Sequence, residues 1–204
     1  IAKGIEDYVK NIEEGGTVTD TTAEVDVEDL ISDQPMLGDK DAKVTLIEFS
    51  DYRCGYCHKF FEETEPLLLA KYVDTGKINF VYKDFILGYD GDYEAALVNE
   101  CIRDQEGDEA FFKFHDYIFQ TISNDGFDYD TYSAYAVKNL GVSAKELKKC
   151  YDNEDFKDEI YADLDQGRAL GINGTPGFVL NGKVIAGAQP YNIFQTQIDA
   201  LLAE

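Results

Sequence analysis

The chain of 204 residues is 44% hydrophobic, which suffices for one substantial core or for a domain that carries a large insertion. Its 41 acidic and 18 basic residues give a formal net charge of -23, which repels nucleic acid and anionic lipid headgroups and argues against both as partners. No run of about 18 uncharged apolar residues occurs, so the sequence predicts no transmembrane helix.

Residues 1 to 30 are expected to form an N-terminal helix followed by an acidic linker. Apolar side chains such as Ile5, Val9 and Ile12 recur at helical spacing before a Gly-Gly pair. The stretch that follows, TVTDTTAEVDVED, is rich in Thr, Asp and Glu and poor in apolar residues, as is typical of a linker.

Residues 31 to 90 show the order strand, helix, strand. Strand-favouring residues occupy 44 to 49 (VTLIEF) and 78 to 85 (INFVYKDF). Between them, a helical pattern starts at or just before Cys54, and Pro66 predicts a kink inside it. The cysteines of this segment are therefore expected at a helix N-terminus.

Residues 91 to 160 are predicted to form a helical insertion, because successive amphipathic patterns appear there with little strand signal. Residues 161 to 204 then contain a hairpin over 177 to 187, with its turn at Asn181-Gly182, and a final amphipathic helix.

The segment CGYCH, residues 54 to 58, fits a c-type haem site, half of a zinc site or a redox dithiol. Haem would take its sixth ligand from Met36, from His115 or from nothing, and would leave the flanking elements unexplained. A structural zinc site wants a second closely spaced cysteine pair, which Cys101 and Cys150 do not form. The redox dithiol is favoured, so we assign no metal and no cofactor.

Two separated elements carry a family resemblance: CGYC directly after a strand, and GTPGFVLNG downstream of a helical block. Together they resemble the thioredoxin-fold DsbA family of extracytoplasmic thiol-disulfide oxidoreductases, over roughly residues 35 to 204. The resemblance implies an α/β thioredoxin fold whose domain is built from residues 31 to 90 and 161 to 204, with residues 91 to 160 as its helical insertion domain.

The dithiol supplies the predicted reaction. A thiolate attacks disulfides, and a helix N-terminus stabilises a thiolate, so Cys54 is the predicted nucleophile. It would form a mixed disulfide with the substrate, which the more buried Cys57 would resolve. The resemblance makes Pro176 the family's cis-proline, which faces the dithiol and offers backbone groups to an extended substrate. Thr175 beside it would contact the substrate and tune the nucleophile.

Three further side chains are expected to support the dithiol. Glu48 shares a strand face with Val44 and Leu46, so it is predicted to be buried with a raised pKa and to exchange a proton with Cys57; the family carries a buried glutamate at this position. Lys83 is a candidate partner for Glu48. His58, four residues after Cys54, could favour the thiolate when charged, with a solvated surface histidine as the alternative.

Cys101 and Cys150 have flanking residues that resemble a second cysteine pair of some DsbA relatives, and this implies a structural disulfide. Closing a loop of about 50 residues would contribute roughly 4 kcal/mol. Two buried free thiols are the alternative.

His115 lies among aromatic residues and is expected in the core without a chemical role. The acidic segment 124 to 130 lacks the ligand spacing of an EF-hand.

The expected activity is oxidation of dithiols in extracytoplasmic proteins. Gly55 and Tyr56, between the cysteines, tune the thiolate and are expected to contact substrate. This dipeptide, followed by His58, looks instead like the DsbC isomerases, which oligomerise, and the N-terminal helix could serve that purpose. A non-catalytic module that binds cysteine-containing polypeptides is a third hypothesis.

The expected partners are unfolded or partly folded secreted proteins that contain cysteines, together with a DsbB- or VKOR-like membrane redox protein. An oxidising compartment suits the cysteine pattern. Because the chain starts at Ile1, we expect that a signal peptide or membrane anchor was removed. The predicted location is therefore extracytoplasmic.

Overall fold

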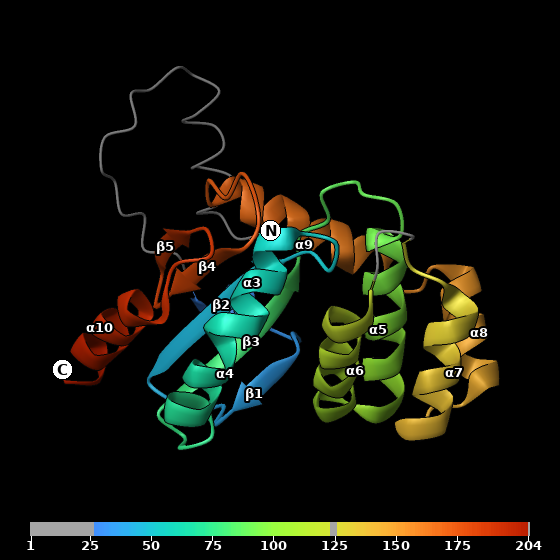
Figure 1. The fold of residues 1–204 in the computed structure, drawn as a ribbon, viewed down its shortest axis with the longest axis horizontal. Coiled ribbons are helices and arrows are strands. Elements are labelled where there is room, and N and C mark those ends of the chain that lie inside the picture. Colours follow the sequence, from blue (N-terminus) through green and yellow to red (C-terminus); the bar gives the residue numbers. More distant parts are fainter. Residues whose placement is uncertain (1–26, 123–125, 204) are drawn as a thin grey trace.

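The protein is built on a five-stranded mixed sheet with the strand order β1-β3-β2-β4-β5 (Figure 1). The structure is a computed structural model that describes residues 27 to 122 and 126 to 203. The N-terminal helix and most of the linker predicted before Leu30 lie outside the described residues, as does part of the acidic segment 124 to 130. The strands are β1 (Met36–Gly38), β2 (Val44–Ser50), β3 (Ile78–Asp84), β4 (Gly177–Leu180) and β5 (Lys183–Ala186).

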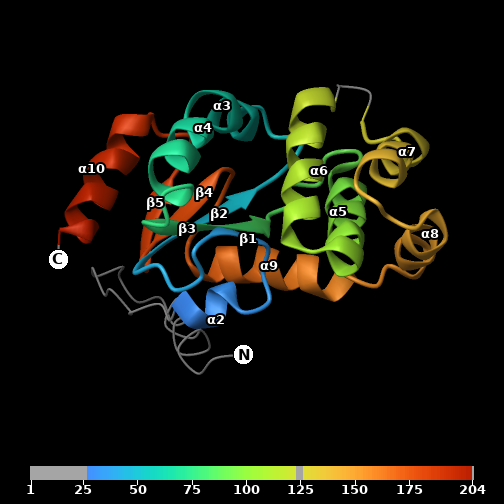
Figure 2. The same cartoon turned by 90° about the horizontal axis from the view of Figure 1, so that it is seen from below.

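The central strands β2 and β3 are parallel and buried along their whole length, because helices cover both faces of the sheet (Figure 2). One face packs against α3 (Gly55–Glu63), α4 (Glu65–Leu68) and α10 (Tyr191–Leu202), and the other against α2 (Val27–Ile31) and α9 (Lys157–Ala169). Gly167 lets α9 lie close to the sheet, since a Cβ there would lie only 2.7 Å from a ring carbon of Phe85.

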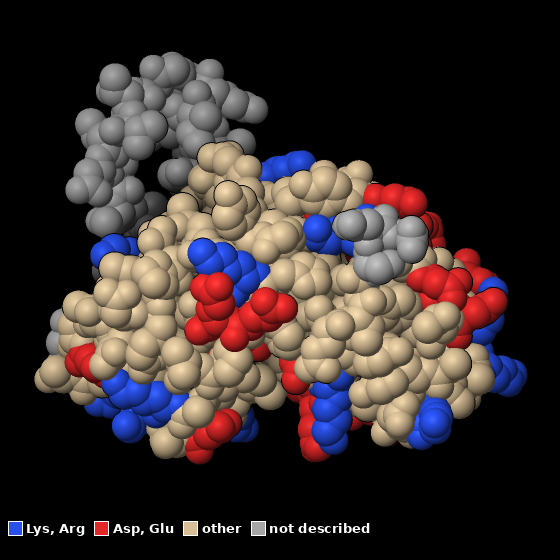
Figure 3. All heavy atoms as spheres, viewed as in Figure 1, with Lys and Arg blue, Asp and Glu red and all other residues tan. Residues whose placement is uncertain are grey.

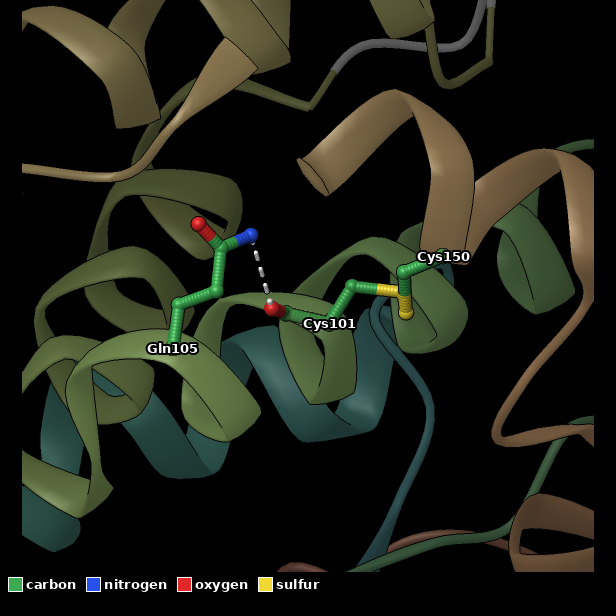
Figure 4. The surroundings of a disulfide bond; sticks show 3 residues. All are labelled: Cys101, Gln105 and Cys150. Atoms are coloured by element: carbon green, nitrogen blue, oxygen red, sulfur yellow. Dashed lines mark hydrogen bonds between the residues drawn. A yellow bond between two sulfur atoms is a disulfide. The ribbon is translucent and has the colours of Figure 1, made fainter. Parts of the chain in front are cut away.

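Four helices lie beside the sheet and together contain most of the residues of the predicted insertion (Figure 1). They are α5 (Asp92–Glu106), α6 (Asp108–Thr121), α7 (Tyr129–Asn139) and α8 (Ala144–Asn153). The Ser143 hydroxyl caps α8 by accepting a hydrogen bond from the Glu146 N–H. Cys101 of α5 and Cys150 of α8 form a disulfide, and the Gln105 amide donates to the Cys101 carbonyl at 3.4 Å (Figure 4). The disulfide thus joins the first and last helices of this group.

The helix predicted to kink at Pro66 is instead three consecutive helices. α3 ends at Glu63, α4 begins at Glu65, and a π-helix, η1 (Leu69–Val73), follows it directly. Pro66 lies in the first turn of α4, where its missing N–H costs no intrahelical hydrogen bond. The proline therefore starts a new helix.

Three other features differ from the expected segment boundaries. α2 occupies the end of the predicted linker and buries Leu30 against the sheet. β1 was not predicted; with three residues it is too short to show a strand pattern. α9 runs across residue 160, so the expected limit between insertion and thioredoxin domain falls inside a helix. The four-segment division itself stays a prediction.

Figure 3 shows how charged side chains are distributed over one face of the molecule, the face that carries α3. In Figure 3 they form small groups of both signs, and much of the face that carries α3 shows neither acidic nor basic residues. In the described part of the chain, no helix has both the length and the apolar character required to cross a lipid bilayer.

Removing the disulfide should destabilise the protein through the unfolded state. The bond closes a loop over a sequence separation of 49, which corresponds to about 4 kcal/mol of unfolding free energy in the chain-entropy model. We expect Cys101→Ala/Cys150→Ala to lose about this amount in denaturant unfolding, measured in a Cys54→Ser/Cys57→Ser background so that the dithiol cannot exchange. Unchanged stability would contradict a structural role.

Candidate active site

The dithiol lies where β2 ends and α3 begins. Cys54 is the N-cap of α3, with φ -78° and ψ 119°, and its carbonyl accepts the first helical hydrogen bond from the His58 N–H at 3.1 Å. The N–H groups of the first helical turn have no partners within the helix and carry its positive dipole end. The Cys54 sulfur is therefore placed where a negative charge is stabilised.

The two cysteines are free thiols with opposite acidities. Cys54 is 6% exposed and Cys57 is 0% exposed. A hydrogen bond from the Cys57 side chain, aided by Thr175 and by backbone N–H groups of Cys57 and Tyr56, outweighs burial and lowers the pKa of Cys54 to about 5. Burial raises the pKa of Cys57 well above its ordinary value. At neutral pH the reduced site therefore holds a Cys54 thiolate and a Cys57 thiol.

Thr175 and Pro176 face the dithiol from the segment before β4. Their peptide bond is cis, and the Cys54 sulfur lies 3.3 Å from the Thr175 carbonyl oxygen, to which it donates a hydrogen bond when it is protonated. β4 follows at once and pairs with β2, so the two sequence-distant elements are held together by the sheet. Between the cysteines, Gly55 and Tyr56 are exposed, and Tyr56 has 68% of its surface accessible. Of these residues, Thr175 and the Tyr56 backbone N–H form hydrogen bonds with the Cys54 sulfur.

Glu48 lies beneath the dithiol on the strand face predicted for it. It is 1% exposed and stands in register with Tyr82 of β3 and Phe178 of β4. Burial, which outweighs a hydrogen bond from Ser50, raises the pKa of Glu48 to about 8, and the Cys54 charge adds to the rise. Glu48 in turn contributes to the raised pKa of Cys57. Such coupling is what a proton exchange between the two groups requires.

The predicted pairing of Lys83 with Glu48 is wrong. Strand side chains alternate between faces, and Lys83 stands in register with Phe49, on the opposite face from Glu48. Its ammonium forms an ion pair with Asp163 of α9 at 2.6 Å and donates to the Leu30 carbonyl at 3.0 Å. Lys83 therefore fastens α9 and α2 to the sheet.

His58 contacts the backbone and an aromatic ring. Its Nε2 lies 2.9 Å from the Tyr52 carbonyl oxygen, and its ring packs edge-on against Phe119 of α6. The imidazole is thus held between the β2–α3 turn and the insertion. Its effect on the thiolate stays a prediction.

One supporting residue of the site, Asp51, was missed. Its carboxylate accepts hydrogen bonds from the N–H groups of Arg53, at 2.6 Å, and Leu87, at 2.7 Å, and so joins the turn before Cys54 to the loop after β3. Burial raises the pKa of Asp51 to about 7. An aspartate directly after a buried strand is a turn-forming residue, and this is the signal that could have identified it.

The comparisons with known proteins identify the family. A family model described as thioredoxin matches residues 31–200. This chain belongs to the thioredoxin family. A probable disulfide bond formation protein D of Bacillus cereus is 31% identical over 158 residues, covering 75% of this chain and 72% of the relative. Disulfide bond formation protein D of Bacillus subtilis is 28% identical over 172 residues, covering 83% of this chain and 77% of that protein.

The fold agrees with that assignment. The crystal structure of oxidised BdbD from Bacillus subtilis superposes with a TM-score of 0.76 at 26% identity, covering 84% of this chain and 94% of that chain. The crystal structure of alpha-DsbA1 from Wolbachia pipientis superposes with a TM-score of 0.70 at 26% identity, covering 84% of this chain and 92% of that chain. The predicted α/β thioredoxin fold with DsbA-like helices is confirmed. The family also confirms the enzyme class, thiol-disulfide oxidoreductase.

The acidity of Cys54 can be measured directly. In the reduced protein, the ultraviolet absorbance of the thiolate should titrate with a midpoint near pH 5, because Cys57 and the helix N-terminus stabilise the anion. The lowered pKa stabilises the reduced protein fully only above the ordinary cysteine pKa of about 8.5, and this contribution decreases as the pH falls and is gone below about pH 5. A midpoint above pH 8, as in an ordinary cysteine, would contradict the geometry.

Lys83→Met separates the structural role of Lys83 from its predicted role in supporting the dithiol. Removing the ammonium leaves the Asp163 carboxylate buried without its cation, so the unfolding free energy should fall by about 3–5 kcal/mol. The double variant Lys83→Met/Asp163→Leu should recover much of this loss. The Cys54 thiolate pKa should stay unchanged in both variants, and a clear shift would restore the predicted supporting role.

Proposed function

We propose that this chain oxidises pairs of thiols in extracytoplasmic proteins by transferring the disulfide of Cys54 and Cys57. The observation that carries the proposal is the opposite acidity of the two sulfurs. A pKa of about 5 at Cys54 stabilises the reduced enzyme and makes Cys54 a good leaving group. Both effects favour giving the disulfide away, as an oxidase does, over the isomerase or reductase alternative.

The first step is attack of a substrate thiolate on Cys54. A bond forms between the substrate sulfur and Cys54, the Cys54–Cys57 bond breaks, and Cys57 leaves with the electron pair. Glu48, whose pKa of about 8 keeps it protonated at neutral pH and whose charge interacts with Cys57, supplies the proton that Cys57 takes up. The product is a mixed disulfide in which Cys57 is a buried thiol.

The second step releases the oxidised substrate. A second substrate thiolate attacks the substrate sulfur of the mixed disulfide, and Cys54 departs as a thiolate, stabilised at the N-terminus of α3. The substrate has lost two electrons and the enzyme dithiol has gained them. Of the two substrate protons, one replaces that given by Glu48 and the other enters solvent. Return of the dithiol to the disulfide requires an oxidising partner, for which we propose a DsbB- or VKOR-like membrane protein.

The substrate would bind as an extended segment beside Thr175 and Pro176. Exposed Gly55 and Tyr56 border the Cys54 sulfur and offer contacts that do not depend on one substrate sequence. Main-chain pairing of this kind suits unfolded or partly folded proteins that contain cysteines. We place the enzyme in an oxidising, extracytoplasmic compartment, where such substrates acquire disulfides.

Trapping tests the reaction scheme. Cys57→Ser should accumulate a stable mixed disulfide through Cys54 with a disulfide-containing model peptide, because no second enzyme thiol resolves it. Cys54→Ser should trap nothing. Mass spectrometry of the non-reduced adduct, followed by peptide mapping, identifies the sulfur. Equal trapping in both variants would contradict the assigned roles, and trapping in neither would favour a non-catalytic binding module.

Glu48→Gln tests the proton exchange. The rate of dithiol oxidation should fall on the order of 10²-fold, because the amide cannot supply a proton to Cys57. In the unchanged enzyme the rate should decline as the pH rises through about 8, where Glu48 loses its proton, and this limb should vanish in the variant. Glu62→Gln, an exposed glutamate of α3, is the matched control. A pH–rate profile that is the same in Glu48→Gln as in the unchanged enzyme would refute the role.

A further inference from the structure

A second cluster of ionisable side chains lies between the thioredoxin part and the helical insertion. Glu65 belongs to α4, and His115 and Asp116 belong to α6. Each offers one ligand atom, and the three atoms lie within 4.8 Å of one another. In Figures 1 and 2, α6 is the helix of the insertion nearest to α3 and α4. The cluster contains neither Cys54 nor Cys57.

Two of the three side chains are buried with unused binding capacity. Glu65 is 3% exposed, and within the described residues no hydrogen bond or ion pair engages its carboxylate. His115 is 0% exposed; its Nδ1 lies 3.0 Å from Asp116 Oδ1, while its Nε2 is buried without a hydrogen-bond partner among the described residues. An unpaired carboxylate in such a place is costly unless a proton or a cation neutralises it.

The surroundings of the cluster increase that cost. Aromatic rings pack around His115, at centroid distances of 4.8 Å for Phe119, 5.1 Å for Tyr82 and 5.7 Å for Phe61. Burial, followed by the negative charges of Glu48 and Asp116, raises the pKa of Glu65 well above its ordinary value. No lysine or arginine forms an ion pair with Glu65, His115 or Asp116 in residues 27–122 and 126–203. Among these residues the site therefore has no fixed cation, so a proton neutralises Glu65, and a bound ion would displace that proton.

We propose that Glu65, His115 and Asp116 form a binding site for a divalent transition-metal cation of the Zn²⁺ class. One imidazole nitrogen and two carboxylates, with a water in the fourth position, make a common set of zinc ligands. The nitrogen ligand disfavours Mg²⁺ and Ca²⁺, which prefer oxygen. Tetrahedral ligands lie about 3.4 Å apart at zinc bond lengths, so small side-chain rotations would close the cluster around an ion. Asp116, whose side chain is 52% exposed, provides access from solvent.

A bound ion would connect two parts of the molecule. It would bridge α4, which packs on the sheet, and α6, which belongs to the insertion, on the side of the sheet that carries Glu48. Since the ion would bind the folded chain and not the unfolded one, it would raise the melting temperature in proportion to its occupancy. Neither cysteine would be a ligand of the ion.

Zn²⁺ titration of the oxidised full chain tests the site, because the closed Cys54–Cys57 disulfide cannot bind the metal. Calorimetry in high salt, which screens weak binding to the acidic surface, should show one Zn²⁺ per chain and a raised melting temperature. Co²⁺ in its place should show the visible absorption of a four-coordinate nitrogen and oxygen site. Glu65→Gln and Asp116→Asn should each weaken Zn²⁺ binding by at least about tenfold.

Glu109→Gln is the matched control, since this glutamate lies exposed on the same helix as His115. It should bind Zn²⁺ like the unchanged chain. Asp116→Asn is the decisive variant, because its side chain is half exposed and its replacement should leave the fold intact even if Glu65→Gln does not fold. Absence of saturable binding would overturn the proposal, as would binding that Asp116→Asn leaves unchanged.

Discussion

The structure depends on one junction, the N-terminus of α3 held against the Thr175–Pro176 segment. β2 delivers Cys54 to the helix N-cap, and β4, paired with the same strand, brings Thr175 beside the Cys54 sulfur, where a hydrogen bond from the Thr175 side chain helps to lower the pKa of Cys54. The sheet thereby builds a thiolate site from two segments that are 121 residues apart. The difference in acidity between the two sulfurs follows from this geometry, because Cys54 faces the helix N-terminus while Cys57 is fully buried.

The two faces of the central strands differ in whether their buried charged side chains are paired. On the α9 face, the Lys83 ammonium meets the Asp163 carboxylate and a backbone carbonyl, so the charges balance and the contact serves packing. On the dithiol face, Glu48 has no cation, and its pKa rises into the range where a carboxyl can give and take protons near neutral pH. The Lys83–Asp163 ion pair thus lies away from the cysteines, whereas the uncompensated carboxyl of Glu48 lies beside them.

Much of this arrangement could be predicted from local patterns. The alternation of β2 placed Glu48 on the inner face, the Asn181-Gly182 turn located the hairpin, and the strand followed by CGYC located the dithiol. The sequence could not show that Lys83 lies on the opposite sheet face from Glu48, because the register between β2 and β3 is a tertiary property. For the same reason, nothing local brings Glu65 to His115, which lies 50 positions away on another helix.

The central claim is that the Cys54–Cys57 couple is an oxidant, and its equilibrium reduction potential in a glutathione buffer tests this claim most directly. We expect a reduction potential of about -120 mV, as for an enzyme whose reduced form is stabilised by an acidic thiolate. A reduction potential of about -270 mV, typical of a thioredoxin that reduces disulfides, would contradict the proposal that this chain is an oxidant.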